Sequence, residues 1–196
     1  MWLRALSGFA IGLVLGIAGV AAADAVWTHG FYRLEAIRDG RFYKSAAMPP
    51  EILVSTCRQL GIRTVIDLRT LGSTDCEQPE SASEVAKERM ALHAANLRHV
   101  HVPADQVPDR ATVAAFLDEI RTAGNGPFLV HCHHGTGRAV LFSAIYRIEQ
   151  EGWTPEDALR HTRLILSGSS FDPDIPRGGK GRFLLAYRPG PRIASQ

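Results

Sequence analysis

The chain has 196 residues, of which 45% are apolar and 21% are charged, so it can bury a core, and a wholly disordered chain is excluded. Its length is typical of one domain, and three cysteines are too few for a disulfide framework. The 22 Lys and Arg residues nearly balance the 20 Asp and Glu residues, which argues against a nucleic-acid binder that relies on a basic surface.

An uncharged run from Ala5 to Ala23 opens the chain. It is longer than the apolar core of about 7–15 residues in a signal peptide and close to the roughly 20 residues of a transmembrane helix. Residues 1–26 are therefore expected to form an N-terminal hydrophobic helix, either a cleaved signal peptide or an uncleaved membrane anchor.

Two opposing signals bear on the side of the membrane. Arg33, Arg38 and Arg41 follow the run closely enough for the positive-inside rule, which favours the cytoplasm for the following domain. The Ala-rich end of the run resembles a cleavage site, which favours export. We expect a membrane-anchored or exported protein on the periplasmic side, and an anchor that faces the cytoplasm stays an alternative.

The rest of the chain divides into a linker at 27–41, one domain at 42–188 and a tail at 189–196. Period-2 and helical patterns alternate through the domain, which predicts an α/β fold with a mainly parallel central sheet wrapped by helices. Strands are expected at 42–45, 63–68, 97–102 and 128–131, and helices at 50–60, 80–92, 109–120, 138–151, from 154 onward and at 181–187.

The most specific motif is Val-His-Cys-His-His-Gly-Thr-Gly-Arg at 130–138. An apolar strand ends at Cys132, a short loop with Gly135 and Gly137 follows, and Arg138 opens an apolar helix. A helix amino end favours an anion, and glycines let successive backbone amides converge on one. The planar fork of Arg138 can bind two phosphate oxygens. The segment therefore predicts a phosphate-binding loop.

Cys132 lies at the base of this loop, where the positive field favours a thiolate over a thiol. A thiolate beneath a bound phosphoryl group is placed for in-line attack, and the same field stabilises the oxygens in the transition state. A purely structural thiol and a metal site are the alternatives. Adjacent His and Cys residues seldom converge on one ion, and no spaced partner pair exists, so we expect no metal.

Cys132, five intervening residues and Arg138 between a strand and a core helix resemble the signature of the cysteine-dependent protein tyrosine phosphatases. The chain is most similar to the dual-specificity branch, especially to compact bacterial enzymes with an amino-terminal export segment. Supporting stretches lie at 43–46, 61–69, 104–109 and 146–153. The resemblance implies a dual-specificity phosphatase-like fold and hydrolysis of phosphate monoesters through a phosphocysteine, without a cofactor. It assigns substrate binding to His133, His134, Gly135, Thr136, Gly137 and Arg138, and an orienting role to His131.

The family also needs a general acid on a loop upstream of the cysteine. Asp105 fits, because it lies between a predicted strand and a predicted helix. Its rival Asp109 has a structural alternative as the cap of that helix.

Other polar residues are given structural interpretations. Asp67 and Arg69 are expected to pair, and His99 and His101 are expected to be half-buried strand residues. Cys57 is expected in the core, although a disulfide with Cys76 stays open.

Ala139 departs from the pattern of many family members, which carry Ser or Thr directly after the arginine. The regenerating-liver phosphatases also have Ala there. In the family the hydroxyl helps the cysteine leave in the second step, so Ala139 implies slow turnover.

Three functions compete. The first is a phosphatase for phosphotyrosine in proteins, with or without activity on phosphoserine and phosphothreonine. The second is an inositol-phosphate or phosphoinositide phosphatase. The missing lysine in the loop argues against the second. The third is a non-catalytic, membrane-tethered phosphate-binding module, against which the set of Cys132, Arg138 and Asp105 argues. The expected partners are a phosphorylated protein and, if the segment at 1–26 is retained, a membrane.

Overall fold

The structure is a computed structural model that describes residues 30–71, 82–124, 126–163 and 166–190, with the single positions 19 and 26. The expected hydrophobic helix at 1–26 lies outside these residues apart from the two single positions, and Cys76 and the last six residues also lie outside them. Within the described part of the chain, no helix has both the length and the apolar character needed to span a membrane.

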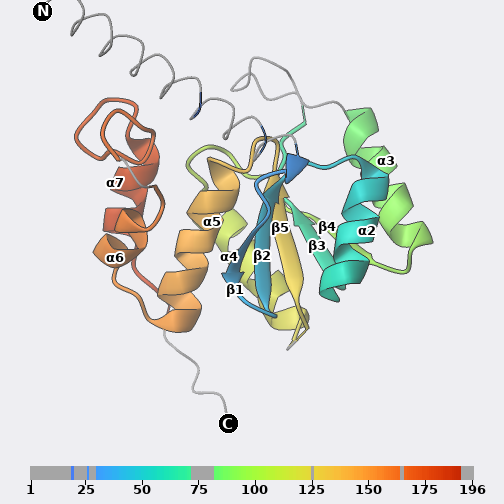
Figure 1. The fold of residues 1–196 in the computed structure, drawn as a ribbon. Coiled ribbons are helices and arrows are strands. Elements are labelled where there is room, and N and C mark those ends of the chain that lie inside the picture. Colours follow the sequence, from blue (N-terminus) through green and yellow to red (C-terminus); the bar gives the residue numbers. More distant parts are fainter. Residues whose placement is uncertain are drawn as a thin grey trace, which may run out of the picture.

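A five-stranded mixed sheet forms the centre of the molecule, with the strand order β1-β2-β5-β3-β4 (Figure 1). The strand β1 runs antiparallel to β2, and the other neighbours are parallel, which confirms the predicted α/β class with a mainly parallel sheet. The strands are β1 (Glu35–Arg38), β2 (Phe42–Ala46), β3 (Thr64–Asp67), β4 (Arg98–His101) and β5 (Phe128–Cys132).

The helices agree with the predicted periodic segments to within a few residues. They are α2 (Pro50–Leu60), α3 (Ala82–Ala94), α4 (Arg110–Thr122), α5 (Arg138–Tyr146), α6 (Pro155–Arg160) and α7 (Gly179–Ala186). The predicted helix at 138–151 is continuous, but its last part, η2 (Arg147–Glu151), is a π-helix that ends at Gly152 in the left-handed conformation.

The expected linker at 27–41 is wrong in its last part. Residues 35–38 form β1, which pairs with β2 at the edge of the sheet. Sequence patterning missed this strand because three of its four residues are exposed, so it has no buried face to produce an alternation. The folded domain therefore begins before residue 42.

Helices cover both faces of the sheet. In Figure 1, α2 and α3 lie on one side of it and α5, α6 and α7 on the other. Strand side chains alternate accordingly. Val65 and Leu129 belong to the core beneath α2 and α3, whereas Ile66 and Val130 belong to the core beneath α4 and α5.

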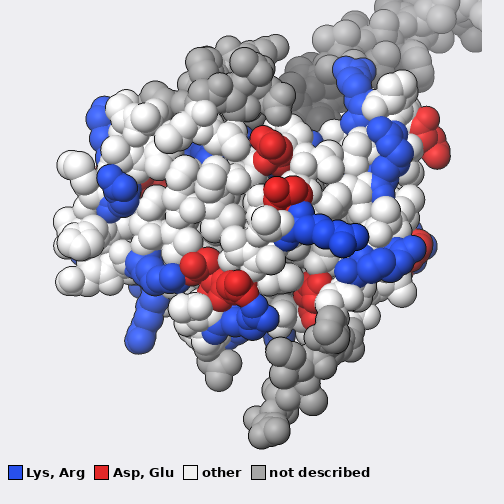
Figure 2. Space-filling view, turned by 180° about the vertical axis from the view of Figure 1, so that it is seen from behind, with Lys and Arg blue, Asp and Glu red and all other residues white. Residues whose placement is uncertain are grey.

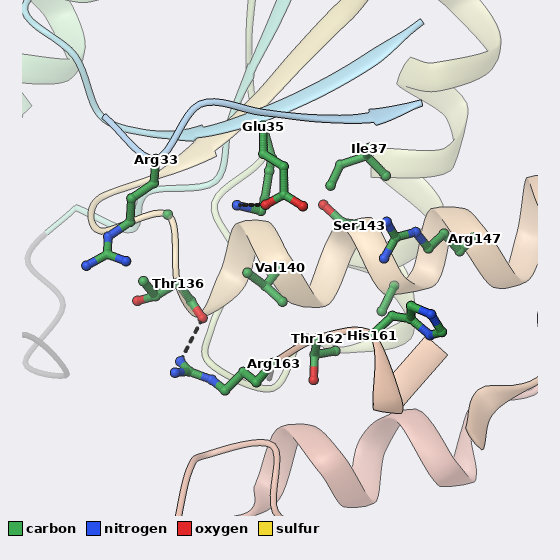
Figure 3. Close-up of a pocket in the computed structure, with 13 residues that line it drawn as sticks. Arg33, Glu35, Ile37, Thr136, Val140, Ser143, Arg147, His161, Thr162 and Arg163 are labelled. Atoms are coloured by element: carbon green, nitrogen blue, oxygen red, sulfur yellow. Dashed lines mark hydrogen bonds and ion pairs between the residues drawn. The ribbon is translucent and has the colours of Figure 1, made fainter. Parts of the chain in front are cut away.

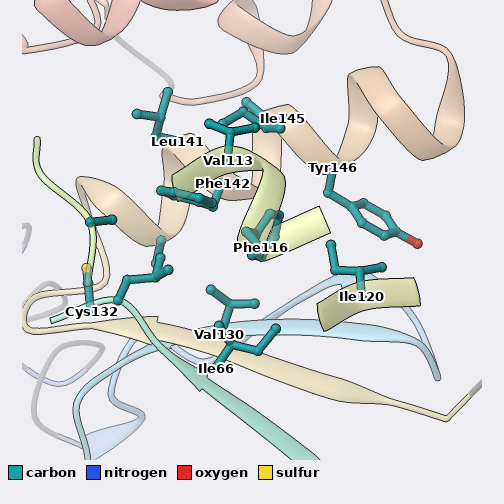
Figure 4. Close-up of a cluster of buried hydrophobic side chains, with 14 of the residues drawn as sticks. Ile66, Val113, Phe116, Ile120, Val130, Cys132, Leu141, Phe142, Ile145 and Tyr146 are labelled. Atoms are coloured by element: carbon teal, nitrogen blue, oxygen red, sulfur yellow. The ribbon is translucent and has the colours of Figure 1, made fainter. Parts of the chain in front are cut away.

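The larger core surrounds α5, which is buried on almost every side (Figure 4). Phe116 of α4 meets Phe142 of α5 edge to face, with ring centroids 4.8 Å apart, and Tyr146 meets Phe42 of β2 in the same way at 4.8 Å. Such pairs add about 0.5–1.5 kcal/mol beyond area burial. Cys132 lies at one end of this cluster, so the larger core supports the start of the predicted phosphate loop.

The register of the parallel strands brings their carboxyl ends to one edge of the sheet. Ala46 of β2 lies beside Cys132 of β5, and Asp67 of β3 lies between His131 of β5 and His101 of β4. In parallel α/β sheets, ligands bind at this edge. The fold thus gathers the residues of the predicted site from strands that are distant in sequence.

The helix α7 lies very close to the segment that precedes it. A Cβ atom on Gly181 would lie 2.1 Å from the Phe171 carbonyl oxygen, and one on Gly178 would lie 1.6 Å from that of Asp172. Only glycine permits these approaches. The contact places Lys180, which lies between the two glycines, in a buried position.

Candidate active site

The predicted phosphate loop forms a tight turn between β5 and α5. Gly135 has a φ of +68°, and a Cβ atom there would lie 2.6 Å from the backbone nitrogen of Ala46. No side chain fits at such a distance, so Gly135 is required both for the left-handed conformation and for the close approach to the end of β2. The Ala47 amide also donates to the His133 carbonyl at 3.0 Å, which ties the loop to the segment after β2.

Two carbonyl groups of the loop are engaged by outside donors. The His133 carbonyl accepts from Ala47, and the Thr136 carbonyl accepts from Arg163 Nη2 at 3.0 Å. In a trans peptide the carbonyl and the following N–H point in opposite directions. The amides of His134 and Gly137 therefore point away from these anchors, which is the arrangement that an anion-binding nest needs.

Cys132 and Arg138 are both buried, with 2% and 3% of their surface exposed. Arg138 Nη1 donates to the Leu68 carbonyl at 3.1 Å and to Thr70 Oγ1 at 3.3 Å. These bonds come from the segment after β3 and fix the orientation of the guanidinium at the start of α5. The two residues on which the sequence motif rests are thus buried at the two ends of the loop, Cys132 at the end of β5 and Arg138 at the start of α5.

The other residues of the loop form its rim. Gly135 is buried, Thr136 and Gly137 are half-buried, His133 is half-buried and His134 is exposed. The rings of His133 and His134 touch edge to face, with centroids 4.4 Å apart. Both imidazoles can therefore contact a substrate that enters from solvent.

Asp105 lies on an exposed loop between β4 and α4, as predicted. The Ala104 amide bonds to the Leu68 carbonyl at 3.3 Å, which holds the start of this loop at the active edge of the sheet. The next residue, Gln106, has its Oε1 3.4 Å from the position that a Cβ atom on Gly137 would occupy. The loop that carries Asp105 therefore reaches the phosphate loop.

Asp109 caps a helix, which is the structural role that the sequence analysis gave as the alternative to a general acid. Its Oδ1 accepts the Thr112 amide at 2.7 Å and caps α4. This hydrogen bond lowers the pKa of Asp109, and a lowered pKa is unsuited to a group that must carry a proton to a leaving oxygen.

A buried cluster of charged residues lies beside the phosphate loop. Arg69 binds Asp67 through both Nε and Nη2, with Nη2 2.8 Å from Oδ2, which confirms the predicted pair. The same Nη2 lies 2.6 Å from Glu88 Oε2 of α3. Burial raises the pKa of Glu88, but His131, His99 and their hydrogen bonds outweigh it and lower the pKa to about 2.

His131 contacts this cluster. Its Nε2 lies 2.9 Å from Glu88 Oε1, so a residue of α3 orients the imidazole next to Cys132. Burial lowers the pKa of His131, whereas Glu88 and Asp67 raise it by more, and the net shift is upward. Sequence reasoning missed Glu88, because it is one acidic residue among several in a charged helix, and only its 1% exposure sets it apart.

His99 completes the cluster from β4. Its Nε2 lies 3.4 Å from Glu88 Oε1 and 3.8 Å from Asp67 Oδ2. Asp67, Glu88 and His99 thus bring three potential metal-ligand atoms within 4.8 Å of one another. Because Arg69 already bridges the two carboxylates, we interpret the group as an ion-pair cluster whose charges are balanced by Arg69 and a protonated imidazole.

Lys180 is a second residue that sequence reasoning missed. It is buried on α7, and its Nζ lies 3.7 Å from the position of a Cβ atom on Gly137. Ser170 Oγ lies 3.4 Å from the same Nζ. The ammonium group therefore adds positive charge beside the phosphate loop, from a helix more than 40 residues away in the sequence.

Cys57 lies in the core beneath α2, as predicted, and is fully buried. Burial and, to a smaller extent, Glu88 raise the pKa of its thiol to about 12. It is thus a structural thiol. The question of a disulfide with Cys76 lies outside the described residues.

On the surface turned away from the viewer of Figure 1, the basic side chains of the described residues do not form a continuous patch. Figure 2 shows Lys and Arg interspersed with Asp and Glu on this face. Oppositely charged side chains also pair directly in the structure, as where Arg98 Nη2 lies 2.5 Å from Glu119 Oε2. On this face the charge pattern agrees with the balance of charges in the sequence.

We expect the cluster around Glu88 to make stability fall with pH. Burial lowers the pKa of His99, but Asp67 and Glu88 raise it overall, from the ordinary 6.5 to about 9. The folded state then holds a proton that the unfolded chain releases, so this contribution is complete below about 6.5 and is lost as the pH rises through about 9. Urea unfolding at a series of pH values measures the slope.

Glu88→Gln should weaken this slope and lower the free energy of unfolding at pH 7 by about 3–5 kcal/mol, because it leaves buried charges unpaired. Glu51→Gln, on the exposed face of α2, is the matched control and should leave both quantities unchanged. The same pH slope in Glu88→Gln and in the wild type would show that the cluster does not hold this proton.

Comparisons with known proteins agree with this geometry. Residues 36–171 match the family PTP-NADK, described as a DSP-PTPase phosphatase fused to NAD+ kinase. Over 110 residues the chain is 43% identical to the dual specificity protein phosphatase TpbA of Pseudomonas aeruginosa UCBPP-PA14, a match that covers 55% of this chain and 49% of that protein. The chain thus spans about half the length of the curated relatives it matches.

Solved structures of phosphatases have a similar fold. A Cys-to-Ser variant of P. aeruginosa TpbA in complex with phosphotyrosine is 26% identical, with a TM-score of 0.52 over 76% of this chain and 78% of that chain. The core catalytic domain of the PP-IP phosphatase SIW14 from S. cerevisiae shares the fold at 15% identity, with a TM-score of 0.57 over 79% of this chain and 85% of that one. Since the family match spans most of the domain, the chain belongs to the DSP-PTPase family of phosphatases.

Proposed function

We propose that the protein is a tyrosine or dual-specificity phosphatase that hydrolyses phosphate monoesters of proteins through a phosphocysteine intermediate on Cys132. One observation carries the proposal. A buried cysteine lies at the base of a glycine loop, two of whose carbonyls are held by donors from outside the loop, with a fixed arginine at the helix start. Such a loop binds a phosphoryl group and places a sulfur beneath it.

In the first step, the Cys132 thiolate attacks phosphorus while the ester oxygen leaves on the opposite side. Arg138 and the inward amides of the loop hold the three equatorial oxygens, where charge is spread in the transition state. Asp105 gives its proton to the leaving oxygen, so that the product is a neutral alcohol. The S–P bond forms as the P–O bond breaks.

In the second step, water attacks the phosphocysteine. Asp105, now a carboxylate, takes a proton from this water, and the Cys132 thiolate leaves with the S–P electron pair. Inorganic phosphate is the product, and the enzyme returns to its starting state. No cofactor takes part in either step.

Phosphotyrosine is the favoured substrate. The related TpbA variant binds phosphotyrosine, and the half-buried and exposed His133 and His134 offer a rim against which an aromatic ring can stack. The proposed location of the enzyme, on the exported side of a membrane and tethered if residues 1–26 are retained, rests on the sequence of that segment.

One observation favours the second candidate, an inositol-phosphate or phosphoinositide phosphatase. The loop has no lysine, but Lys180 brings an ammonium group beside Gly137 from α7. An additional cation near the loop suits a substrate with more than one phosphate. Comparing phosphate release from a phosphotyrosine peptide and from an inositol polyphosphate separates the two candidates.

Cys132→Ser should abolish phosphate release from a phosphotyrosine peptide, because an alcohol is a much weaker nucleophile than a thiolate. Binding of vanadate should persist, since the loop and Arg138 are unchanged. Cys57→Ser is the matched control and should retain turnover. More than a few per cent of wild-type activity in Cys132→Ser would refute the assignment, and inactivity of the wild type would favour a non-catalytic binding module.

Asp105→Asn should reduce the rate by about 10²–10⁴-fold on phenyl phosphate, whose leaving group needs a proton. The loss should be much smaller on p-nitrophenyl phosphate, whose leaving group departs as an anion. Asp109→Asn serves as the control, since that residue caps α4. Equal losses on both substrates would place the general acid elsewhere.

Ala139 is fully buried at the second position of α5 and cannot donate a hydrogen bond to the departing sulfur. A charge-assisted hydrogen bond contributes about 1.5–3 kcal/mol, which corresponds to a roughly 10- to 100-fold slower second step than with a hydroxyl present. Rapid mixing should show a burst of the first product close to one equivalent of enzyme.

Ala139→Ser should raise the steady rate and reduce this burst. Ala139→Gly adds no hydroxyl and controls for the change of a buried side chain. If the wild type shows no burst and Ala139→Ser leaves the rate unchanged, another donor such as Thr136 already serves the sulfur.

A further inference from the structure

Residues 68–70 follow β3 directly and leave the sheet at the edge where the parallel strands end. We call them the 68–70 segment. The Leu68 amide donates to the His131 carbonyl at 2.9 Å, which ties the segment to the residue before Cys132. Leu68 and Arg69 are buried, with 0% and 4% of their surface exposed, so this part of the segment lies inside the molecule rather than on a surface loop.

The Leu68 carbonyl joins two parts of the candidate site. It accepts from Arg138 Nη1 at 3.1 Å and from the Ala104 amide at 3.3 Å. Ala104 directly precedes Asp105, the proposed general acid. A carbonyl oxygen has two lone pairs, so it can accept from both donors at once. One oxygen atom therefore sets the position of the Arg138 guanidinium relative to the start of the Asp105 loop.

Thr70 makes a second contact with the same nitrogen of Arg138. Its Oγ1 lies 3.3 Å from Arg138 Nη1. Each Nη atom of a guanidinium carries two hydrogens, so the Leu68 carbonyl and the Thr70 hydroxyl can accept one each. Two acceptors on one nitrogen fix the plane of the guanidinium as well as its position. A guanidinium binds two oxygens of a phosphoryl group in that plane, so its orientation decides how the phosphoryl group is held.

The 68–70 segment is itself fixed through Arg69. The Arg69 carbonyl lies 2.7 Å from His101 Nε2 of β4, and since a carbonyl can only accept, the imidazole is the donor. The Arg69 amide donates to Asp67 Oδ1 at 2.9 Å, and the Arg69 side chain bridges Asp67 and Glu88. The backbone and the side chain of Arg69 are therefore both engaged, and the segment can shift only by breaking these hydrogen bonds.

The amides of the phosphate loop have separate supports. Arg163 holds the Thr136 carbonyl from the outer side of the loop (Figure 3), and the Ala47 amide holds the His133 carbonyl. Both donors lie outside the 68–70 segment. A change in this segment should therefore alter Arg138 and the loop after Ala104, while the amides of the phosphate loop keep their orientation.

We propose that Thr70 and His101 are positioning residues of the candidate site, which act through the 68–70 segment. Thr70 orients Arg138 through its hydroxyl. His101 holds the Arg69 carbonyl and thereby sets both Arg138 and the Asp105 loop, which share the neighbouring Leu68 carbonyl. The inference rests on the roles proposed above for Arg138 and Asp105, and it assigns roles to two side chains that lie outside the sequence motif.

Vanadate binding to the full chain, measured by calorimetry, tests Thr70 without any turnover. Thr70→Val should weaken this binding by about three- to tenfold, the effect of one ordinary hydrogen bond, because the Leu68 carbonyl alone then holds Arg138 Nη1. Thr70→Ser keeps the hydroxyl and should bind vanadate as the wild type does. Thr122→Val, which replaces an exposed threonine at the end of α4, is the matched control and should leave binding unchanged.

Turnover of two esters tests His101. His101→Ala should weaken vanadate binding and should also reduce kcat on phenyl phosphate about threefold or more beyond its effect on p-nitrophenyl phosphate, because a displaced Asp105 matters only where the leaving oxygen needs a proton. His101→Gln keeps an N–H donor of similar reach and should restore the wild-type ratio of the two rates. Thr70→Val should leave this ratio unchanged. His93→Ala, on the exposed face of α3, is the matched control.

Two results would overturn the proposal: wild-type vanadate affinity in Thr70→Val, and a wild-type ratio of the two rates in His101→Ala. Thermal unfolding checks that each variant is folded, and Thr70→Ala or His101→Leu takes the place of one that is not. A wild-type chain that binds vanadate but hydrolyses neither ester would refute the proposed phosphatase activity instead. The vanadate titrations of the Thr70 and His101 variants would still decide whether the 68–70 segment positions Arg138.

Discussion

The site depends on one constraint, which is that the carbonyls of the phosphate loop must point outward. The Ala47 amide holds the His133 carbonyl and Arg163 holds the Thr136 carbonyl, so the following amides face the inside of the loop. Gly135 makes the first of these bonds possible, because any side chain there would collide with the backbone of Ala46. The position of β2 beside β5 is therefore part of the active site as well as of the sheet.

The buried charges behind the loop carry a cost that the fold must offset. Removing Asp67, Glu88 and Arg69 from water is unfavourable by several kcal/mol per ion, and an apolar cluster of the same volume would be at least as stable. What the charges provide is orientation, since Glu88 fixes His131 and Arg69 fixes both carboxylates. The free energy of unfolding at a single pH does not reveal this orienting role. The pH dependence of stability does, because it reports whether the imidazole held by the carboxylates keeps its proton in the folded state.

Most of the site could be predicted from the sequence because its parts are local. Cys132, Gly135 and Arg138 lie within one strand–loop–helix unit, and the cap at Asp109 and the pair of Asp67 with Arg69 are also short-range. Glu88 and Lys180 could not be found in this way. Each comes from a helix whose contact with the loop is set by tertiary packing, and the strand at 35–38 was missed because it is an exposed edge.

Arg163 reaches the phosphate loop from outside the strand–loop–helix unit that carries the motif. Its Nη2 donates to the Thr136 carbonyl, and the next amide, that of Gly137, points the other way because the carbonyl and the amide are opposite ends of one peptide plane. Without this bond the carbonyl could turn, and the Gly137 amide would turn with it. The segment after α6 therefore belongs to the candidate site in the same sense as the segment after β2, from which Ala47 holds the His133 carbonyl.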